Sequence, residues 1–301
     1  MQFSWLLGCG ALLVIGLGLG RYYLVEPEAT AESLGGAIAQ ASYANLPAPP
    51  PFLDDLTQAS VVYLAETHTD PADHIAQLSL IQALQEQRGD IAIGLEMIQR
   101  PFQPVLDRYI SGEITEAELV EQTQYERRWG YSWELYAPIF RYAQSQGIPL
   151  IALNTPTEIT RQVAREGLNS LEPEAFTYIP PLEEIDTTNA DYQAVVAEVF
   201  SFHGGHGNSG PSFENFFAAQ VLWDETMADR VASYLTENPD DQVVVLAGEG
   251  HILQGYGIPD RVQRRFDNSL TTYSVLLNSD IQDPEAADFF WNLPPISVPE
   301  S

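Results

Sequence analysis

The stretch "VVYLAETHTDPADH", residues 61–74, passes directly from an apolar run into a cluster of carboxylates and histidines. An apolar, β-branched run that ends in polar residues predicts a buried strand. Asp70 and Pro71 are the residue types of a helix N-cap and first helical position, so a helix is expected to follow. Capping accounts for Asp70, but a buried strand has no structural need for Glu66 and His68 at its end.

Strand and helix patterns alternate along the rest of the chain. Apolar runs that predict buried strands lie at 60–64, 91–95, 148–153, 243–247 and 272–277. Helical patterns lie at 70–87, 101–111, 115–128, 134–146, 157–170, 189–202, 213–237 and 259–266. Strands separated by helices predict an α/β fold, with a mostly parallel sheet flanked by helices, helical insertions and a single domain.

Composition divides the chain into four parts. We expect a membrane anchor or signal segment at 1–20, an acidic Pro/Ala-rich linker at 21–57, the α/β domain at 58–278 and a Pro- and acid-rich tail at 279–301.

The run "FSWLLGCGALLVIGLGLG", residues 3–20, is uncharged and long enough to cross a bilayer core as a helix. It has three interpretations: an uncleaved anchor, a lipoprotein signal in which "LLGC" (6–9) precedes lipidation of Cys9, or a signal cleaved near "ATA" (29–31). Each interpretation places the domain on the extracytoplasmic side of the membrane, in the cell envelope.

Charge and residue usage exclude several functions. The net charge is −29, and all 13 basic residues are arginine. The lack of lysine excludes a P-loop lysine and a Schiff-base lysine, and so acidic a chain argues against nucleic-acid binding. Cys9 is the only cysteine, which excludes an intramolecular disulfide and a cysteine-based zinc site.

Ionisable side chains recur where the predicted strands end. In a parallel sheet these carboxyl ends meet at one edge, where ligands bind. The side chains that we expect at this edge are Glu66, His68, His74, Glu96 and His251.

Two chemistries suit such a set. All five side chains are of types that bind a divalent metal ion. With open positions on such a metal, Glu66, His68, Glu96 and His251 would be the catalytic residues of a metal-dependent hydrolase. Alternatively, a histidine held by a glutamate deprotonates water without a metal.

Several motifs together resemble the ChaN-like haem-binding uptake proteins, which are grouped with the Tiki metalloproteases and, more remotely, the erythromycin esterases. The motifs are "AETH" (65–68), "DH" (73–74), "GLEM" (94–97), "LDRY" (106–109), "GIPLIALN" (147–154), "AQVLWDETMA" (219–228), "AGEGH" (247–251) and "GIPDR" (257–261). The resemblance covers roughly residues 58–278, and Ala65 stands where the family has glycine.

The resemblance implies a cell-envelope protein of haem or iron uptake, with haem at the surface or at a homodimer face. Haem needs an axial ligand, for which His203, His206 and Tyr131 are candidates. The alternative is a metal-dependent hydrolase of the Tiki type at the edge of the sheet, so whether the protein is an enzyme stays open.

Overall fold

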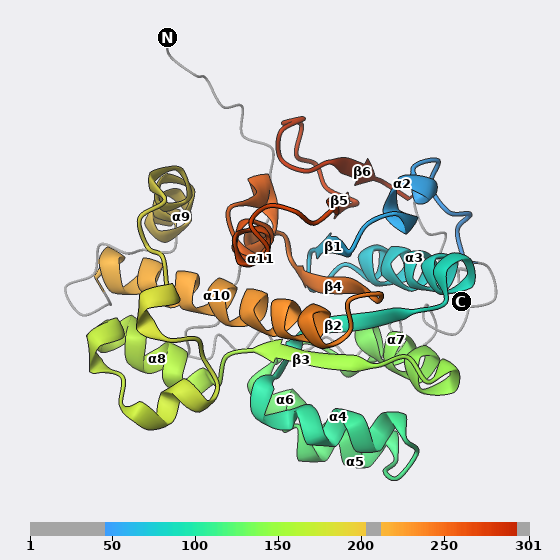
Figure 1. Cartoon of the computed structure of the whole chain (residues 1–301), viewed down its shortest axis with the longest axis horizontal. Helices are drawn as coiled ribbons and strands as arrows, with labels where there is room; N and C mark the ends of the chain where they lie inside the picture. The colour runs from blue at the N-terminus through green and yellow to red at the C-terminus, as the bar shows by residue number, and fades with distance from the viewer. Residues whose placement is uncertain (1–45, 203–211, 294–301) are drawn as a thin grey trace, which may run out of the picture.

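Six parallel strands form one sheet in the order β3-β2-β4-β1-β5-β6 in the computed structural model, which describes residues 46–202 and 212–293 (Figure 1). The strands are β1 (Val61–Glu66), β2 (Ile91–Gln99), β3 (Leu150–Asn154), β4 (Gln242–Gly248), β5 (Thr272–Leu277) and β6 (Phe289–Trp291). The five predicted strands and the predicted α/β class are therefore confirmed.

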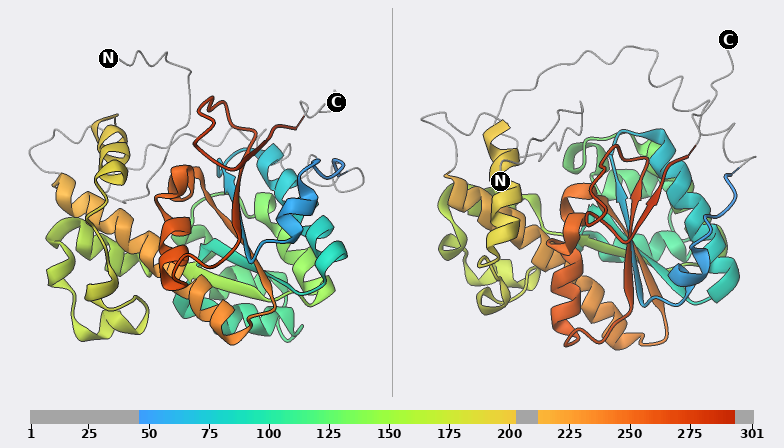
Figure 2. Two further views of the ribbon diagram at one scale, coloured as in Figure 1. Left: turned by 45° about the horizontal axis from the view of Figure 1, so that its top comes forward. Right: turned by 90° about the horizontal axis from the view of Figure 1, so that it is seen from above.

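Helices connect the strands and cover both faces of the sheet (Figure 2). They are α2 (Leu53–Thr57), α3 (Pro71–Arg88), α4 (Gln103–Ile110), α5 (Glu116–Gln122), α6 (Tyr125–Arg128), α7 (Trp133–Gln146), α8 (Thr157–Glu166), α9 (Ala190–Phe202), α10 (Phe213–Glu237) and α11 (Ile258–Arg265). The helix that was expected to begin after Asp70 does so, since the Asp70 side chain accepts a hydrogen bond of 2.9 Å from the backbone N–H of Ala72.

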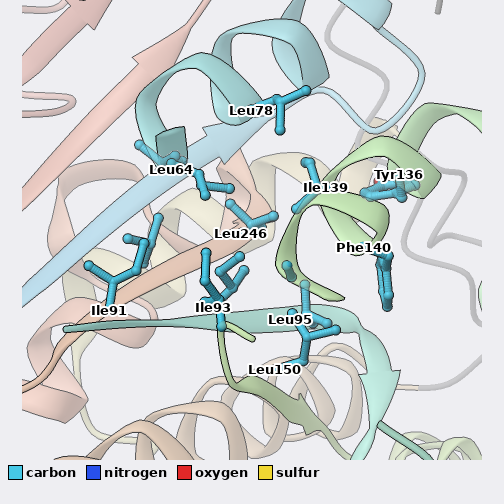
Figure 3. Packing of buried hydrophobic residues seen from close by; sticks show 14 of the residues in the cluster. Leu64, Leu78, Ile91, Ile93, Leu95, Tyr136, Ile139, Phe140, Leu150 and Leu246 are labelled. Atoms are coloured by element: carbon cyan, nitrogen blue, oxygen red, sulfur yellow. The ribbon is translucent and has the colours of Figure 1, made fainter. Parts of the chain in front are cut away.

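Side chains of successive strand residues pack on opposite faces of the sheet. Leu64 and Leu246 contribute to a core under α3 and α7 (Figure 3), whereas Tyr63 and Val245 pack in a second core with α10 and α11. Because both faces are covered, β1, β2 and β4 are buried along their whole length, which explains their continuous apolar runs.

A third hydrophobic cluster holds the helical insertion in place. It joins α8, α9 and the first half of α10 through buried residues that include Val163, Tyr192 and Phe217. The insertion stands to one side of the sheet in Figure 2 and brings the first half of α10 to the carboxyl ends of the strands.

The ordered core extends beyond residues 58–278 at both ends. α2 packs against α3, and β6 adds a strand beside β5, with Val275 paired to Phe289. The ring of Phe289 stacks on that of Phe52, with 4.3 Å between ring centroids. The sequence patterns predicted neither element.

The expected membrane segment lies outside the described residues, as does Cys9. Within residues 46–202 and 212–293, no helix is both long and apolar enough to cross a membrane.

Candidate functional site

Strand order brings the ends of β1, β2 and β4 together. β4 lies between β2 and β1, with Leu246 paired to Leu95 and Gly248 paired to Glu66. Glu66 and Glu96 therefore lie on either side of the turn that follows β4, at one edge of the sheet, as the sequence predicted.

His68 is held by the buried carboxylate of Glu66. The His68 Nδ1 atom lies 2.8 Å from Glu66 Oε1, which also accepts a hydrogen bond from the Tyr136 hydroxyl. Gln77 Nε2 donates to the second oxygen, Oε2, at 2.5 Å. Burial by itself would raise the pKa of Glu66, but the charge of His74 and the contacts with His68 lower it to about 2.

His251 has a second set of partners of the same kind. Its Nδ1 atom lies 2.6 Å from Oδ1 of Asp224, which is fully buried. The Tyr192 hydroxyl donates to Asp224 Oδ2 at 2.7 Å, and Gln220 Nε2 donates to the Tyr192 oxygen at 3.1 Å. Each histidine is thus held by a carboxylate that a tyrosine hydroxyl supports, with a glutamine amide beside it.

The imidazoles of His68 and His251 differ at the second ring nitrogen, Nε2. His251 Nε2 lies 3.4 Å from Glu96 Oε1, so both of its ring nitrogens face carboxylates. Burial would lower the pKa of His251, but the charges of Glu96 and Asp224 and hydrogen bonds to both raise it to about 10. His251 is therefore a cation at neutral pH, placed between two anions.

His68 Nε2, in contrast, has no hydrogen-bond partner among the residues that the structure describes. The His68 side chain is 18% exposed, and its ring centroid lies 4.8 Å from those of Trp129 and Tyr131. We call Trp129 and Tyr131 the aromatic shelf. His68 is therefore the histidine of this site that presents a free nitrogen beside partly exposed aromatic rings.

The lack of a side chain at Gly248 lets His68 and its partners lie close to the turn that carries His251. Its backbone N–H donates to Glu96 Oε2 at 2.7 Å. A Cβ atom at this position would lie 2.8 Å from Cε1 and 3.0 Å from Nε2 of His68. The glycine before Glu249 and His251 is thus required by close approach to the His68 ring.

His74 faces away from a ligand position. Its Nδ1 lies 3.1 Å from Gln77 Oε1, and its Nε2 lies 3.1 Å from the backbone oxygen of His68. His74 therefore supports the turn after β1.

The expected divalent-metal site gains no support from these contacts. His74 and His251 both use their two ring nitrogens on protein partners, which leaves Glu66, His68 and Glu96 of the expected set. Within the described parts of the chain, no group of three such residues is arranged to hold a metal ion.

Sequence patterns missed several residues of this site. Asp224 and Gln220 lie one helical turn apart in "AQVLWDETMA", where polar residues interrupt an apolar helix. That interruption is the signal that would have identified them. His203 and His206 lie outside the described residues, whereas Tyr131 is beside His68.

Comparison with known proteins places the chain in a family. A family model described as haem-binding uptake, Tiki superfamily, ChaN, matches residues 52–262. The fold is similar to that in a structure of cofacial haem binding to ChaN of Campylobacter jejuni, with a TM-score of 0.64, 19% identity and coverage of 79% of this chain and 89% of that chain.

Two further likenesses are weaker. An erythromycin esterase in its open conformation gives a TM-score of 0.43 at 16% identity, over 75% of this chain and 71% of that one. The chloroplastic protein RETICULATA-RELATED 5 of Arabidopsis thaliana is 25% identical over 264 residues, which are 79% of this chain. The chain spans about a third (34%) of that relative's length.

Proposed function

The chain belongs to the ChaN haem-binding uptake family of the Tiki superfamily, and we propose on that premise that it binds haem in the cell envelope and serves haem or iron uptake. The family match over residues 52–262, which contains the whole candidate site, carries this proposal. The family resemblance inferred from the sequence motifs is thereby confirmed.

The aromatic shelf has the residues that a haem group needs. Trp129 and Tyr131 are partly exposed and lie 5.4 Å apart between ring centroids, so they offer an apolar surface to a planar group. The Tyr131 phenol oxygen is an axial-ligand candidate, alongside His203 and His206. Haem bound there would bring redox-active iron to the protein surface.

Binding through Tyr131 would depend on pH. Burial and the charges of Glu96 and Glu66 raise the pKa of Tyr131 to about 12, so the phenol is protonated at neutral pH. A ligand bond from the phenolate oxygen therefore releases a proton, and affinity should rise with pH.

Titration with hemin tests this proposal. The wild-type protein should give a saturable Soret shift that is stronger at pH 8.5 than at pH 6.5. Tyr131→Phe should abolish this pH dependence and weaken binding at least tenfold, whereas the control Tyr142→Phe, also partly buried, should not. The variants His203→Ala and His206→Ala distinguish the other two ligand candidates. A shift no larger than that with an unrelated acidic protein would refute haem binding.

Envelope location rests on the apolar segment at residues 3–20. We expect the protein to sediment with membranes and to be released to the soluble fraction when residues 1–20 are deleted. Protease added outside the cytoplasmic membrane should digest it. Sedimentation velocity with and without hemin tests whether haem joins two copies as a homodimer.

A second candidate function is hydrolysis, and the open nitrogen of His68 favours it. In the neutral imidazole with its proton on Nδ1, towards Glu66, His68 would carry a lone pair on Nε2 that accepts a proton from water. Burial would lower the pKa of His68, but the hydrogen bond to Glu66 and the charges of Glu96 and Glu66 raise it, so we expect turnover to increase with pH. The neighbouring Glu249 carboxyl has a pKa raised by burial, which suits it to donate a proton to a leaving group. The geometry supports a metal-free version of the hydrolase hypothesis better than the metal-dependent one.

Variants separate the two functions. His68→Asn should abolish turnover of a panel of esters and peptides, and Tyr131→Phe should leave that turnover intact while it weakens haem binding. Activity that persists in EDTA supports the metal-free reaction. Loss of activity in EDTA with recovery on added metal would instead support the metal-dependent reaction. Inactivity on every substrate would count against both the metal-free and the metal-dependent hydrolase.

A further inference from the structure

A cavity of about 400 Å³ lies between the end of β2, α6 and the start of α8, and none of the candidate-site residues lines it. Pro101, Phe102, Pro156 and Ile159 give it apolar walls, and the segment at 172–178 also lines it. Sites for small organic ligands range over roughly 300–1,000 Å³. The cavity is therefore large enough for such a ligand.

Arg128 is held in a fixed position at this cavity. Its guanidinium carbon lies 5.2 Å from the centroid of the Phe102 ring. Its Nη1 donates to Gln99 Oε1 at 2.7 Å, and its Nε donates to Gln124 Oε1 at 3.0 Å. Nη1 also lies 3.2 Å from Glu158 Oε2, but the Glu158 side chain is 68% exposed, so this pair is weak and a ligand can replace it. Nη2 makes no hydrogen bond with any described residue, so Arg128 offers a preorganised, charged donor.

Two further side chains of the lining have an accessible polar atom without a partner. The Tyr178 hydroxyl makes no hydrogen bond with any described residue. Gln162 donates its Nε2 to the backbone oxygen of Ser170 at 2.6 Å, which leaves its Oε1 unpaired among the described residues. Neither atom is buried from solvent, and neither is Nη2 of Arg128. A ligand in the cavity can therefore reach two donors and one acceptor.

The lining carries charges of both signs. Arg128 is the one basic side chain among the described residues of the lining, whereas Glu172 and Glu174 are exposed and pair with no described basic residue. A planar guanidinium suits a carboxylate, and the two glutamates suit an ammonium group but repel a ligand that is only an anion. We propose that this cavity binds a free α-amino acid with an apolar side chain. Its carboxylate contacts Arg128, its ammonium group faces the glutamates, and its side chain packs against Phe102 and Ile159.

Ligand-observed NMR titration of the full chain with L-phenylalanine tests this site. Saturable binding is expected with a Kd on the order of 1 mM, as for other ligands of about a dozen non-hydrogen atoms. N-acetyl-L-phenylalanine lacks the ammonium charge and L-phenylalaninamide lacks the carboxylate, so each should bind at least fivefold more weakly. Arg128→Gln should weaken the binding of L-phenylalanine at least tenfold. The matched control is Arg127→Gln, because Arg127 is exposed and lines a different cavity.

Three results would overturn the proposal: no saturable binding, equal affinity for the three ligands, or equal effects of Arg128→Gln and Arg127→Gln. If Arg128→Gln does not fold, Tyr178→Phe decides. It should weaken the binding of L-phenylalanine about fivefold to tenfold and leave the free energy of unfolding unchanged, because the Tyr178 hydroxyl has no partner among the described residues. Unchanged affinity in Tyr178→Phe would then refute the site. Failure here leaves haem binding untouched, because the cavity shares no residue with the aromatic shelf.

Discussion

Substitution of Gly248 by alanine should destabilise the protein through one contact. The backbone at Gly248 has φ −59° and ψ 146°, which alanine adopts without strain. The new methyl carbon would lie 2.8 Å from His68 Cε1, so the ring must move by roughly 0.6 Å to restore ordinary contact. Such overpacking costs about 1–3 kcal/mol, and the ring has little room because Trp129 and Tyr131 flank it.

A double-mutant cycle measures that contact directly. Urea unfolding should give Gly248→Ala a free energy of unfolding about 2 kcal/mol below wild type. In a His68→Ala background the clash is absent, and Gly248→Ala should be neutral or stabilise by about 0.5 kcal/mol because the unfolded chain loses freedom. The coupling energy between the two sites should therefore exceed about 1 kcal/mol.

The result that refutes the reasoning is additivity. If Gly248→Ala lowers the free energy of unfolding equally with and without the His68 ring, close approach to His68 is not the reason for glycine at position 248. Hemin titration of Gly248→Ala adds a functional readout, since displacement of His68 should also disturb the adjoining aromatic shelf.

Glu66→Gln should lower the free energy of unfolding by roughly 3 kcal/mol at pH 6, because the pKa of Glu66 in the folded protein is about 2. The difference in stability from wild type should disappear as the pH falls from about 5 to 2. Urea unfolding at pH 6 and at pH 3 measures this difference. For His251, whose pKa is raised to about 10, stabilisation is complete below about pH 6 and is lost as pH rises towards 10. His251→Gln should therefore cost less stability at pH 10 than at pH 6, and NMR should show no titration of its ring between pH 6 and 8. Thr115→Ala removes a capping box with Glu118 and should cost about 1 kcal/mol in urea unfolding without an effect on hemin binding.

Strands that consist of a continuous apolar run and are buried were predictable from the sequence. β1, β2 and β4 are buried on both faces, so their residue types alone identify them. β6 was missed because its three residues lie in a Pro- and acid-rich segment. It is stabilised by pairing with β5 and by the stacking of Phe289 on Phe52, a contact over more than two hundred residues that no local pattern contains.

The candidate site was predictable only in part, for the same reason. Glu66, His68, Glu96 and His251 follow from the rule that strand ends share one edge. The partners of the histidines do not follow from it, because Asp224 and Tyr192 reach His251 only through the packing of α9 and α10. The inward turn of His74 depends on Gln77, one turn along α3, and local spacing could not separate this role from a ligand role.

The place of β4 in the sheet has a consequence for synthesis of the protein. β4 is the only described strand that contacts both β1 and β2, yet it begins at Gln242, more than 140 residues after β2 ends. In a nascent chain the β1 and β2 segments therefore lack their shared neighbour until most of the domain has left the ribosome, and β1 has no strand to pair with until then. We therefore expect the sheet to close late and slowly. Until it closes, apolar residues of β1 and β2 are exposed, and we expect chaperones to bind the chain there.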